Sequence, residues 1–213
     1  MATLKEIAYN IKNLISGGVG SDDSDIDLRQ IKFMIHYHRA NLLMQYTDNG
    51  RKSSDIIYQT DVLSNSSSGS RLKSVLGFND DRAIREVSLK EDSGIEADYE
   101  IIQLVRHADR AFVNQSRFVR KSGRKIATRE NDMIYVWDGD SLVTDGTLSV
   151  KAAYSNPTDV AGFNEDTSTY PLPEELISVL IKQIAQVEFN LILGTPGKKP
   201  NNQADEQAQS KEV

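Results

Sequence analysis

The chain has 213 residues, a net charge of −6, 38% hydrophobic residues and no cysteine. This hydrophobic content supports a folded core and excludes wholesale disorder, while the lack of cysteine excludes disulfide bonds, thiol catalysis and cysteine-ligated metal sites. The acidic balance argues against a chain that binds nucleic acid over its whole surface. The N-terminal residues lack a basic start and an apolar run, and no stretch approaches the ~18 uninterrupted apolar residues of a membrane span. We therefore expect neither a signal peptide nor a membrane-spanning segment.

The first predicted element is an amphipathic helix over residues 3–15. Thr3 and Glu6 have the spacing of a capping box, in which a hydroxyl and a carboxylate each bind the other's backbone amide. Apolar residues recur every three or four positions on one face, which is typical of a helix that covers a core. The glycine- and aspartate-rich run 16–27 that follows predicts a loop.

A second helix is predicted over residues 28–46, with Asp27 as its N-cap. Its main apolar stripe consists of Leu28, Ile31, Ile35, Leu42 and Tyr46. Further apolar residues fall partly outside this stripe: Phe33, Met34, Tyr37 and Leu43. A helix that is apolar on more than one side is predicted to pack against more than one surface.

From residue 55 to residue 154, short β-branched and aromatic runs alternate with turn residues, which is typical of strands. Strands are predicted over residues 56–63, 85–90, 99–105, 125–128, 133–137 and 148–154. Asp138-Gly139-Asp140 predicts a tight hairpin turn, and the polar run 64–70 predicts a loop. Segment 106–118 is compatible with either a short helix or a loop.

The last predicted helix covers residues 173–193, after prolines at 171 and 173. Apolar residues lie nearly all round it, which predicts a long, buried helix. The polar run 195–213 predicts a tail that is disordered or becomes ordered on a partner. The sequence thus predicts a single α+β domain over residues 1–194. An N-terminal helix pair and a long apolar C-terminal helix would flank a small, mostly antiparallel β region over residues 55–154.

No catalytic, metal or cofactor site is expected. His36 and His38 lie two positions apart on a predicted helix and point in nearly opposite directions, and His107 is remote in sequence, so the pattern does not suggest a zinc site. The acidic loop 22–27 lacks the glutamate that closes a calcium-binding loop, and the glycine-rich run 16–21 lacks the lysine of a P-loop. A hydrolase whose catalytic residues come together only in the folded protein is one possible function. Two further functions follow from the charge distribution.

Segment 106–129 differs from the rest of the chain in charge. It contains eight basic residues and one acidic residue, a net charge of +7, so the remainder of the chain carries −13. A contact between copies, in which the basic segment of one copy meets the acidic surface of the next, accounts for both the basic segment and the acidic remainder of the chain. The alternative is a nucleic-acid-binding accessory protein that uses the segment to contact phosphates. We favour contact between copies. The candidate interface residues are Arg117, Arg120, Lys121, Arg124 and Lys125 for charge, with Leu28, Ile31 and Ile35 for packing.

Several short segments follow one another in a definite order. An Arg-Gln-Ile helix at 29–31 comes after the first helix and the glycine/aspartate loop. Gln-Ser-Arg-Phe at 115–118 precedes the basic stretch, and Asp-Met-Ile-Tyr-Val follows at 132–136. Asn-Pro-Thr at 156–158 and Tyr-Pro-Leu-Pro-Glu-Glu at 170–175 complete the order. Over residues 3–202 this order resembles that of a structural protein of crAss-like and related short-tailed phages.

The resemblance implies a virion protein, made in the cytoplasm of the bacterial host, that forms one of the stacked rings joining the capsid portal to the short tail. It implies no enzymatic activity and no cofactor. Its implied partners are copies of itself in a cyclic homo-oligomer, a dodecamer matching the portal, together with the portal and adjacent ring or tail proteins. Genomic DNA would pass through the ring without sequence-specific binding, and no membrane is involved.

Overall fold

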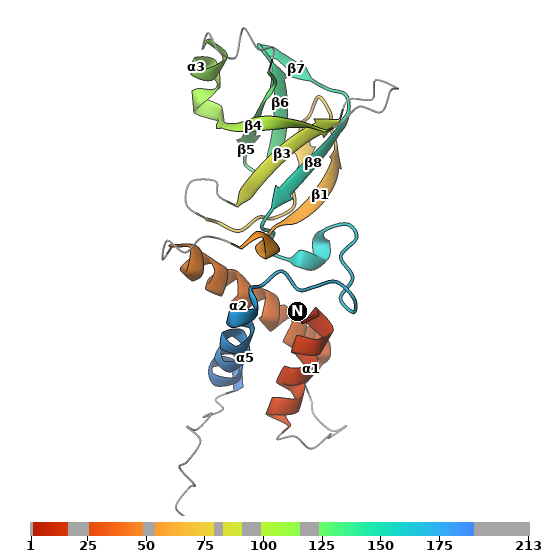
Figure 1. The fold of residues 1–213 in the computed structure, drawn as a ribbon, viewed down its shortest axis with the longest axis vertical. Coiled ribbons are helices and arrows are strands. Elements are labelled where there is room, and N and C mark those ends of the chain that lie inside the picture. The colour runs from red at the N-terminus through yellow and green to blue at the C-terminus, as the bar shows by residue number, and fades with distance from the viewer. Residues whose placement is uncertain are drawn as a thin grey trace, which may run out of the picture.

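The computed structural model describes residues 2–16, 26–48, 54–78, 83–90, 99–115 and 124–189. The molecule is elongated, with three helices at one end and a curled sheet at the other (Figure 1). We call α1 (Leu4–Ile15), α2 (Leu28–Asp48) and α5 (Glu174–Phe189) the helical unit. The strands with α3 (Arg110–Gln115) form the sheet unit. Each unit has its own cluster of buried hydrophobic residues.

α1 begins at the predicted capping box. The Thr3 hydroxyl accepts a hydrogen bond from the Glu6 amide at 3.2 Å, and the Glu6 carboxylate accepts one from the Thr3 amide at 2.9 Å. Thr3 also forms an isolated antiparallel bridge with Thr169, which fixes the start of α1 to the segment before α5. The capping prediction is confirmed.

Replacing Thr3 with alanine is expected to lower the free energy of unfolding by about 1 kcal/mol, because the Glu6 amide loses its hydroxyl acceptor. Thr3→Ser keeps the hydroxyl and serves as the control, with a smaller loss. Urea denaturation followed by circular dichroism measures both variants. Equal losses for alanine and serine would show that the hydroxyl does not stabilise α1.

α2 starts after Asp27, whose carboxylate accepts a hydrogen bond from the Arg29 amide at 3.1 Å, as expected for an N-cap. One side of α2 lies in the core, where Ile31 and Ile35 are fully buried. The opposite side faces solvent, and there Phe33 is 72% and Tyr37 57% exposed. Of the apolar residues outside the main stripe, Phe33 and Tyr37 are therefore exposed, whereas Leu43 is fully buried and Met34 packs against the core.

The described chain contains eight strands in one curled sheet, in the order β1-β8-β3-β4-β5-β6-β2, with β7 paired to β6. Their bounds are β1 (Gln59–Ser64), β2 (Ser70–Arg71), β3 (Ile84–Lys90), β4 (Glu100–Arg106), β5 (Ile126–Glu130), β6 (Met133–Asp138), β7 (Ser141–Val143) and β8 (Thr147–Ala152). Neighbouring strands are antiparallel except β4 and β5, which run parallel. Alternate residues of β8 point into the sheet core, where Leu148 and Val150 are fully buried.

The six predicted strands are present, with shifted ends. The first begins only at Gln59, because Asp55–Ile57 form a 3-10 turn. Asp138-Gly139-Asp140 forms the predicted hairpin turn between β6 and β7, with Gly139 at a φ of +58° that favours glycine. Segment 106–118, for which the sequence predicts either a short helix or a loop, forms a 3-10 turn at His107–Asp109 and then the short helix α3, as far as the structure describes it.

Two parts of the predicted architecture are wrong. The β region is an eight-stranded sheet and is not small. The C-terminal helix is short: α5 has 16 residues in the described chain and is amphipathic, with Leu180 and Ile184 in the core and Lys182 on the exposed side. Residues 190–213, which include the end of the predicted helix and the predicted tail, lie outside the described residues. Within the described ranges, no helix is long and apolar enough to cross a membrane.

Arg39 of α2 connects the helical unit to the end of the sheet. Its side chain is fully buried, with Nε donating to the Pro171 carbonyl and Nη1 to the Tyr154 carbonyl, both at 2.9 Å. The guanidinium also lies 5.7 Å from the ring centre of Tyr170. Tyr154 lies just after β8 and Pro171 just before α5, so one side chain holds three separate parts of the chain together.

Candidate interaction surface between β4 and β5

β4 changes its pairing partner part-way along. Glu100–Ile102 pair with β3, whereas Gln103–Arg106 pair with β5. Because β5 begins opposite Gln103, the β5-facing edge of residues 100–102 has no partner strand within the described ranges. The two strands therefore form a fork, and an unpaired strand edge can accept an added strand from another polypeptide.

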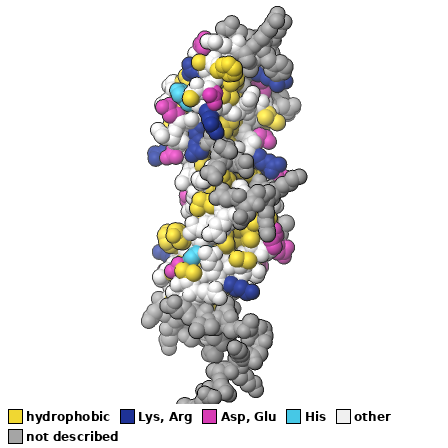
Figure 2. Space-filling view, turned by 90° about the vertical axis from the view of Figure 1, so that its left-hand side faces the viewer, with side chains coloured by type: hydrophobic (Ala, Val, Ile, Leu, Met, Phe, Trp, Pro, Cys, Tyr) yellow, Lys and Arg dark blue, Asp and Glu magenta, His cyan; other side chains and the backbone are white. Residues whose placement is uncertain are grey.

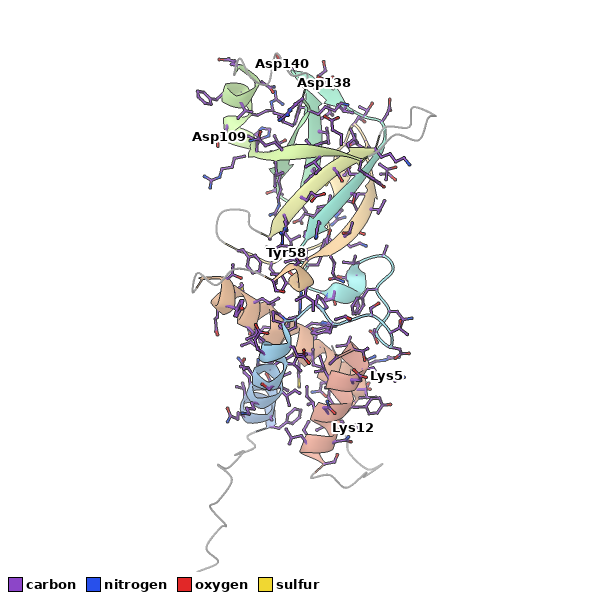
Figure 3. All side chains as sticks on the ribbon, viewed as in Figure 1. Lys5, Lys12, Tyr58, Asp109, Asp138 and Asp140 are labelled. Carbon is purple, nitrogen blue, oxygen red and sulfur yellow. The ribbon has the colours of Figure 1, made fainter. Side chains whose placement is uncertain are left out.

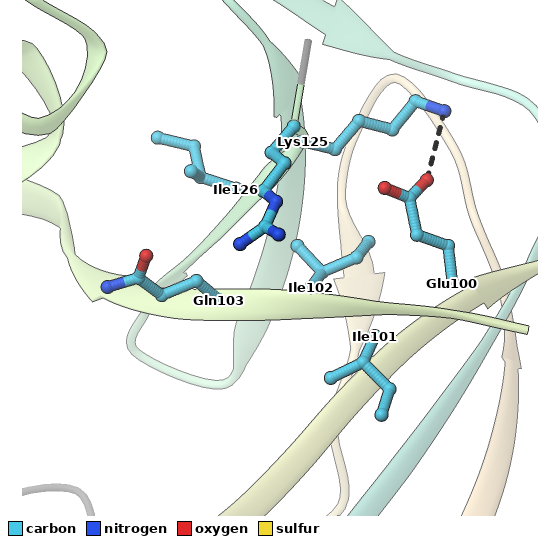
Figure 4. A pocket seen from close by; sticks show the side chains of 7 residues that line it. Glu100, Ile101, Ile102, Gln103, Lys125 and Ile126 are labelled. Atoms are coloured by element: carbon cyan, nitrogen blue, oxygen red, sulfur yellow. Dashed lines mark ion pairs between the residues drawn. The ribbon is translucent and has the colours of Figure 1, made fainter. Parts of the chain in front are cut away.

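A pocket of about 500 Å³ occupies this fork (Figure 4). It is lined by Glu100, Ile101, Ile102, Gln103, Arg124, Lys125 and Ile126. Lys125 reaches across the opening to Glu100, with Nζ 3.7 Å from the carboxylate. Ile101 and Ile102 point to opposite faces of β4, and Ile101 is 71% exposed whereas Ile102 is buried. Among the described residues, the fork thus offers a backbone edge without a partner strand, an exposed apolar side chain and charges of both signs.

The predicted charged residues are only partly placed by the structure. Arg124 and Lys125 both line the fork, while Arg117, Arg120 and Lys121 lie outside the described residues. The fork was not predicted as a pocket, because Glu100 and Ile101 carry no signal beyond belonging to a strand. A role for the charged set in an interface stays a prediction.

The predicted packing residues lie in the other unit, so the structure does not bring them together with the charged set. Ile31 and Ile35 are fully buried in the core of their own chain, and Leu28 is half-buried against it. Their packing partners here are intramolecular. An interface role for these residues stays a prediction. Because they are buried, they could affect an interface only by shaping the core beneath it.

The described part of segment 106–129 contacts aromatic and polar groups of its own chain. The Arg110 guanidinium lies 3.7 Å from the ring centre of Trp137, and Arg129 donates to the Asn131 carbonyl at 2.9 Å. Asp138 and Asp140 lie at the end of the sheet farthest from the helices, and Asp109 lies lower, beside the end of β4 (Figure 3). α3 contacts that acidic turn, because the Asn114 amide donates to the Gly139 carbonyl. Among the described residues, the acidic turn at Asp138 and Asp140 therefore lies beside α3 of this segment.

The three histidines do not converge. His36 Nδ1 lies 3.0 Å from the Tyr170 hydroxyl, and His38 Nε2 lies 2.8 Å from a carboxylate oxygen of Glu188. Burial, and to a smaller extent the positive charges of Arg39 and Lys32, lower the pKa of His36 to about 4, while Glu165 opposes this shift. Burial also raises the pKa of Tyr154 and Tyr170. These shifts follow from core packing around Arg39 and not from a cleft. Across the described chain, no cluster of three acidic or histidine side chains could hold a metal ion.

The chain matches a family model described as phage tail ring protein 2, over residues 6–207. It belongs to this family of phage tail ring proteins. The match confirms the resemblance to a crAss-like phage ring protein. Among curated proteins, no sequence matches the chain.

For a tail ring protein, the functional sites are the surfaces that contact other copies and neighbouring tail proteins. The family assigns this tail ring protein a structural role in the virion, with self-association and tail partners. On the side of the molecule shown in Figure 2, hydrophobic side chains are exposed on both the upper, sheet part and the lower, helical part. The exposed apolar side chains of the described chain include Ile101 at the fork and Phe33 and Tyr37 on α2.

Proposed function

We propose that this protein forms a closed homo-oligomeric ring that links the portal to the tail around the DNA channel, with twelve copies to match the portal. The family match over residues 6–207 carries the proposal. Contacts between two different faces of identical copies close into a ring when the rotation between neighbours returns to its start. The predicted domain over residues 1–194 would be the ring subunit, made in the host cytoplasm and incorporated into the virion.

The fork supports a contact with an acidic, extended segment of a neighbouring copy or of an adjacent tail protein. Its free β4 edge would supply backbone hydrogen bonds, and Ile101 an apolar contact. Arg124 and the basic residues that precede it would select for acidic side chains.

Native mass spectrometry of the recombinant protein, alone and mixed with its portal, tests the proposed function. A closed ring, or a ring that forms only on the portal, is the expected result and gives the symmetry directly. A protein that stays monomeric in both samples would contradict the proposed link to the portal.

Reversing the charge at Arg124 is expected to weaken ring assembly about tenfold, because the contact then repels an acidic partner. Ring assembly should be abolished when four further reversals are added: Arg117→Glu, Arg120→Glu, Lys121→Glu and Lys125→Glu. Lys90→Glu, an exposed reversal on the same unit, is the matched control and should assemble like the wild type. The measurement is the fraction of protein in rings at several salt concentrations, since salt screens the wild-type contact as well. Intact rings from the fivefold variant would disprove the charged interface.

The alternative proposal, nucleic-acid binding, is favoured by Phe112, which is 81% exposed in the basic segment. Against it, Arg110 is stacked on Trp137 and the adjoining turn is acidic. Titration of the monomer with DNA decides between the two proposals. Affinity that falls steeply with salt would support the alternative, and absence of binding at low salt would remove it.

A further inference from the structure

The curled sheet nearly closes on itself, because the strands at the two ends of its order lie beside each other. β1 is the first strand of that order, and β2, which pairs with β6, is the last. Two side chains of residues 70–73 reach across to β1. The Ser70 hydroxyl donates to the Ser64 carbonyl at 3.0 Å, and the Lys73 ammonium lies 3.4 Å from the Asp61 carboxylate. We call this junction between residues 59–64 and 70–73 the seam.

The seam is held by side chains and not by a backbone ladder. Among the described strands, β1 forms its ladder with β8 alone. The backbone groups of alternate residues in a strand point to the same side. Because the Ser64 carbonyl faces the seam, the backbone groups of Thr60 and Val62 face it too. The next amide along, that of Asn65, bonds to Gly146 on the β8 side. Behind the seam, β1 is therefore a strand edge, and such an edge can pair with another chain.

Asp61 carries a full charge into the core beside the seam. Its side chain is 1% exposed, and it lies opposite the buried Val150 of β8. Within the described ranges, Lys73 is the cation that pairs with it. The Lys73 side chain is 36% exposed and also donates to the Asp159 carbonyl. Lys73 can therefore withdraw into water, whereas Asp61 would then remain as a buried carboxylate without a counter-ion, which is strongly destabilising.

We infer that the Lys73–Asp61 ion pair locks the seam and keeps the edge of β1 from pairing with a second copy. While Lys73 neutralises Asp61, residues 70–73 stay against β1 and cover its edge. Without the ammonium, the carboxylate is stabilised by moving towards water, and this movement opens the seam. β1 has little other protection. Gln59–Ser64 contain no lysine or proline, the residues that commonly protect an edge strand, and Val62 is 55% exposed. The inference does not depend on the proposed ring.

The test measures how fast β1 pairs between copies of the full chain. The chain has no cysteine, so Val62→Cys places a single thiol beside the edge. Disulfide-linked dimers should form about tenfold faster when Lys73→Met is added, because methionine replaces the stem of lysine but leaves Asp61 unpaired. Lys90→Met is the matched control, since it removes an exposed lysine from β3, which has a strand on each side, and it should leave the rate unchanged. A thiol at Glu86→Cys, also exposed on β3, should show no acceleration by Lys73→Met.

A further variant separates the charge from the packing. Asp61→Asn added to Lys73→Met also removes the buried charge, so dimers through position 62 should form within about twofold of the original rate. A double variant that crosslinks as fast as Lys73→Met alone would show that lost packing opens the seam, and would overturn the inference.

Two other outcomes would also overturn the inference. One is an unchanged rate at position 62 in a Lys73→Met protein that circular dichroism shows to be folded. The other is faster crosslinking at positions 62 and 86 alike, which would indicate general unfolding. If Lys73→Met does not fold, Ser70→Ala replaces it and should raise the rate about threefold, because it removes only the hydrogen bond to Ser64. An unchanged rate in that variant would contradict the lock. Ring formation is measured separately by native mass spectrometry, so failure of either proposal leaves the other standing.

Discussion

Replacing Arg39 with alanine is expected to lower the free energy of unfolding by about 4 kcal/mol. The substitution leaves the carbonyl groups of Tyr154 and Pro171 buried without donors, at a cost of about 1–3 kcal/mol each. It also removes packing against the Tyr170 ring and opens a cavity in the core. Urea denaturation followed by circular dichroism and by tyrosine fluorescence measures the loss.

Two further variants separate these causes. Arg39→Met fills most of the volume but supplies no donor, so its loss reports mainly the two unpaired carbonyls. Arg29→Ala, on the exposed first turn of the same helix, is the matched control and should change the free energy by about 0.5 kcal/mol or less. If Arg39→Ala were no more destabilised than Arg29→Ala, the central role of Arg39 would be disproved.

Lowering the pH from 7.5 to 5 is expected to reduce the free energy of unfolding by about 2 kcal/mol through His36 alone, and by about 3 kcal/mol at pH 4. The pKa of His36 is lowered from 6.5 to about 4 in the folded protein. The unfolded chain therefore binds the proton more readily between these two values. The contribution of His36 to the free energy of unfolding is fully present above pH 6.5. It decreases as the pH falls from 6.5 to 4, and it changes little below pH 4.

His36→Asn provides the test, because asparagine can still reach the Tyr170 hydroxyl but does not titrate. Its urea midpoint should change less between pH 6.5 and pH 4 than that of the wild type. His107→Asn, at an exposed position, is the control and should keep the wild-type slope. The same slope for wild type and His36→Asn would show that His36 does not carry the pH dependence.

Features that depend on three or four neighbouring residues were predictable from the sequence. Three examples are the Thr3–Glu6 capping box, the Asp27 cap and the turn at Gly139. Each depends only on residues that lie a few positions apart in the sequence. The order of the strands was not predictable, because pairing joins distant segments: Gln59 lies opposite Ala152, for example. β2 and β7 were missed because two or three residues are too few to show alternation.

The error at α5 has a specific origin. Val179 and Val187 lie on its exposed side, at 43% and 60% exposure, so a pattern read along the chain looked apolar all round.

The candidate site was predictable only in part. Charge alone pointed to Arg124 and Lys125, but the opposite wall of the fork, with Glu100 and Ile101, arises only when β4 changes its partner. Asp138 and Asp140, which lie beside α3, likewise come from a different part of the chain.

The contacts of Arg39 also determine when the chain can finish folding during synthesis. Its acceptors lie 115 and 132 residues further along, and the core beneath α1 and α2 is completed by α5, the last of the described helices in chain order. At 5–20 residues per second, a ribosome needs roughly 7–26 s to reach Pro171 after Arg39 has been added. For that time the apolar sides of the first two helices can pack against each other but not against α5. We therefore expect the helical unit to finish folding only after α5 has been synthesised, and the nascent chain to be a client for the host's chaperones until then.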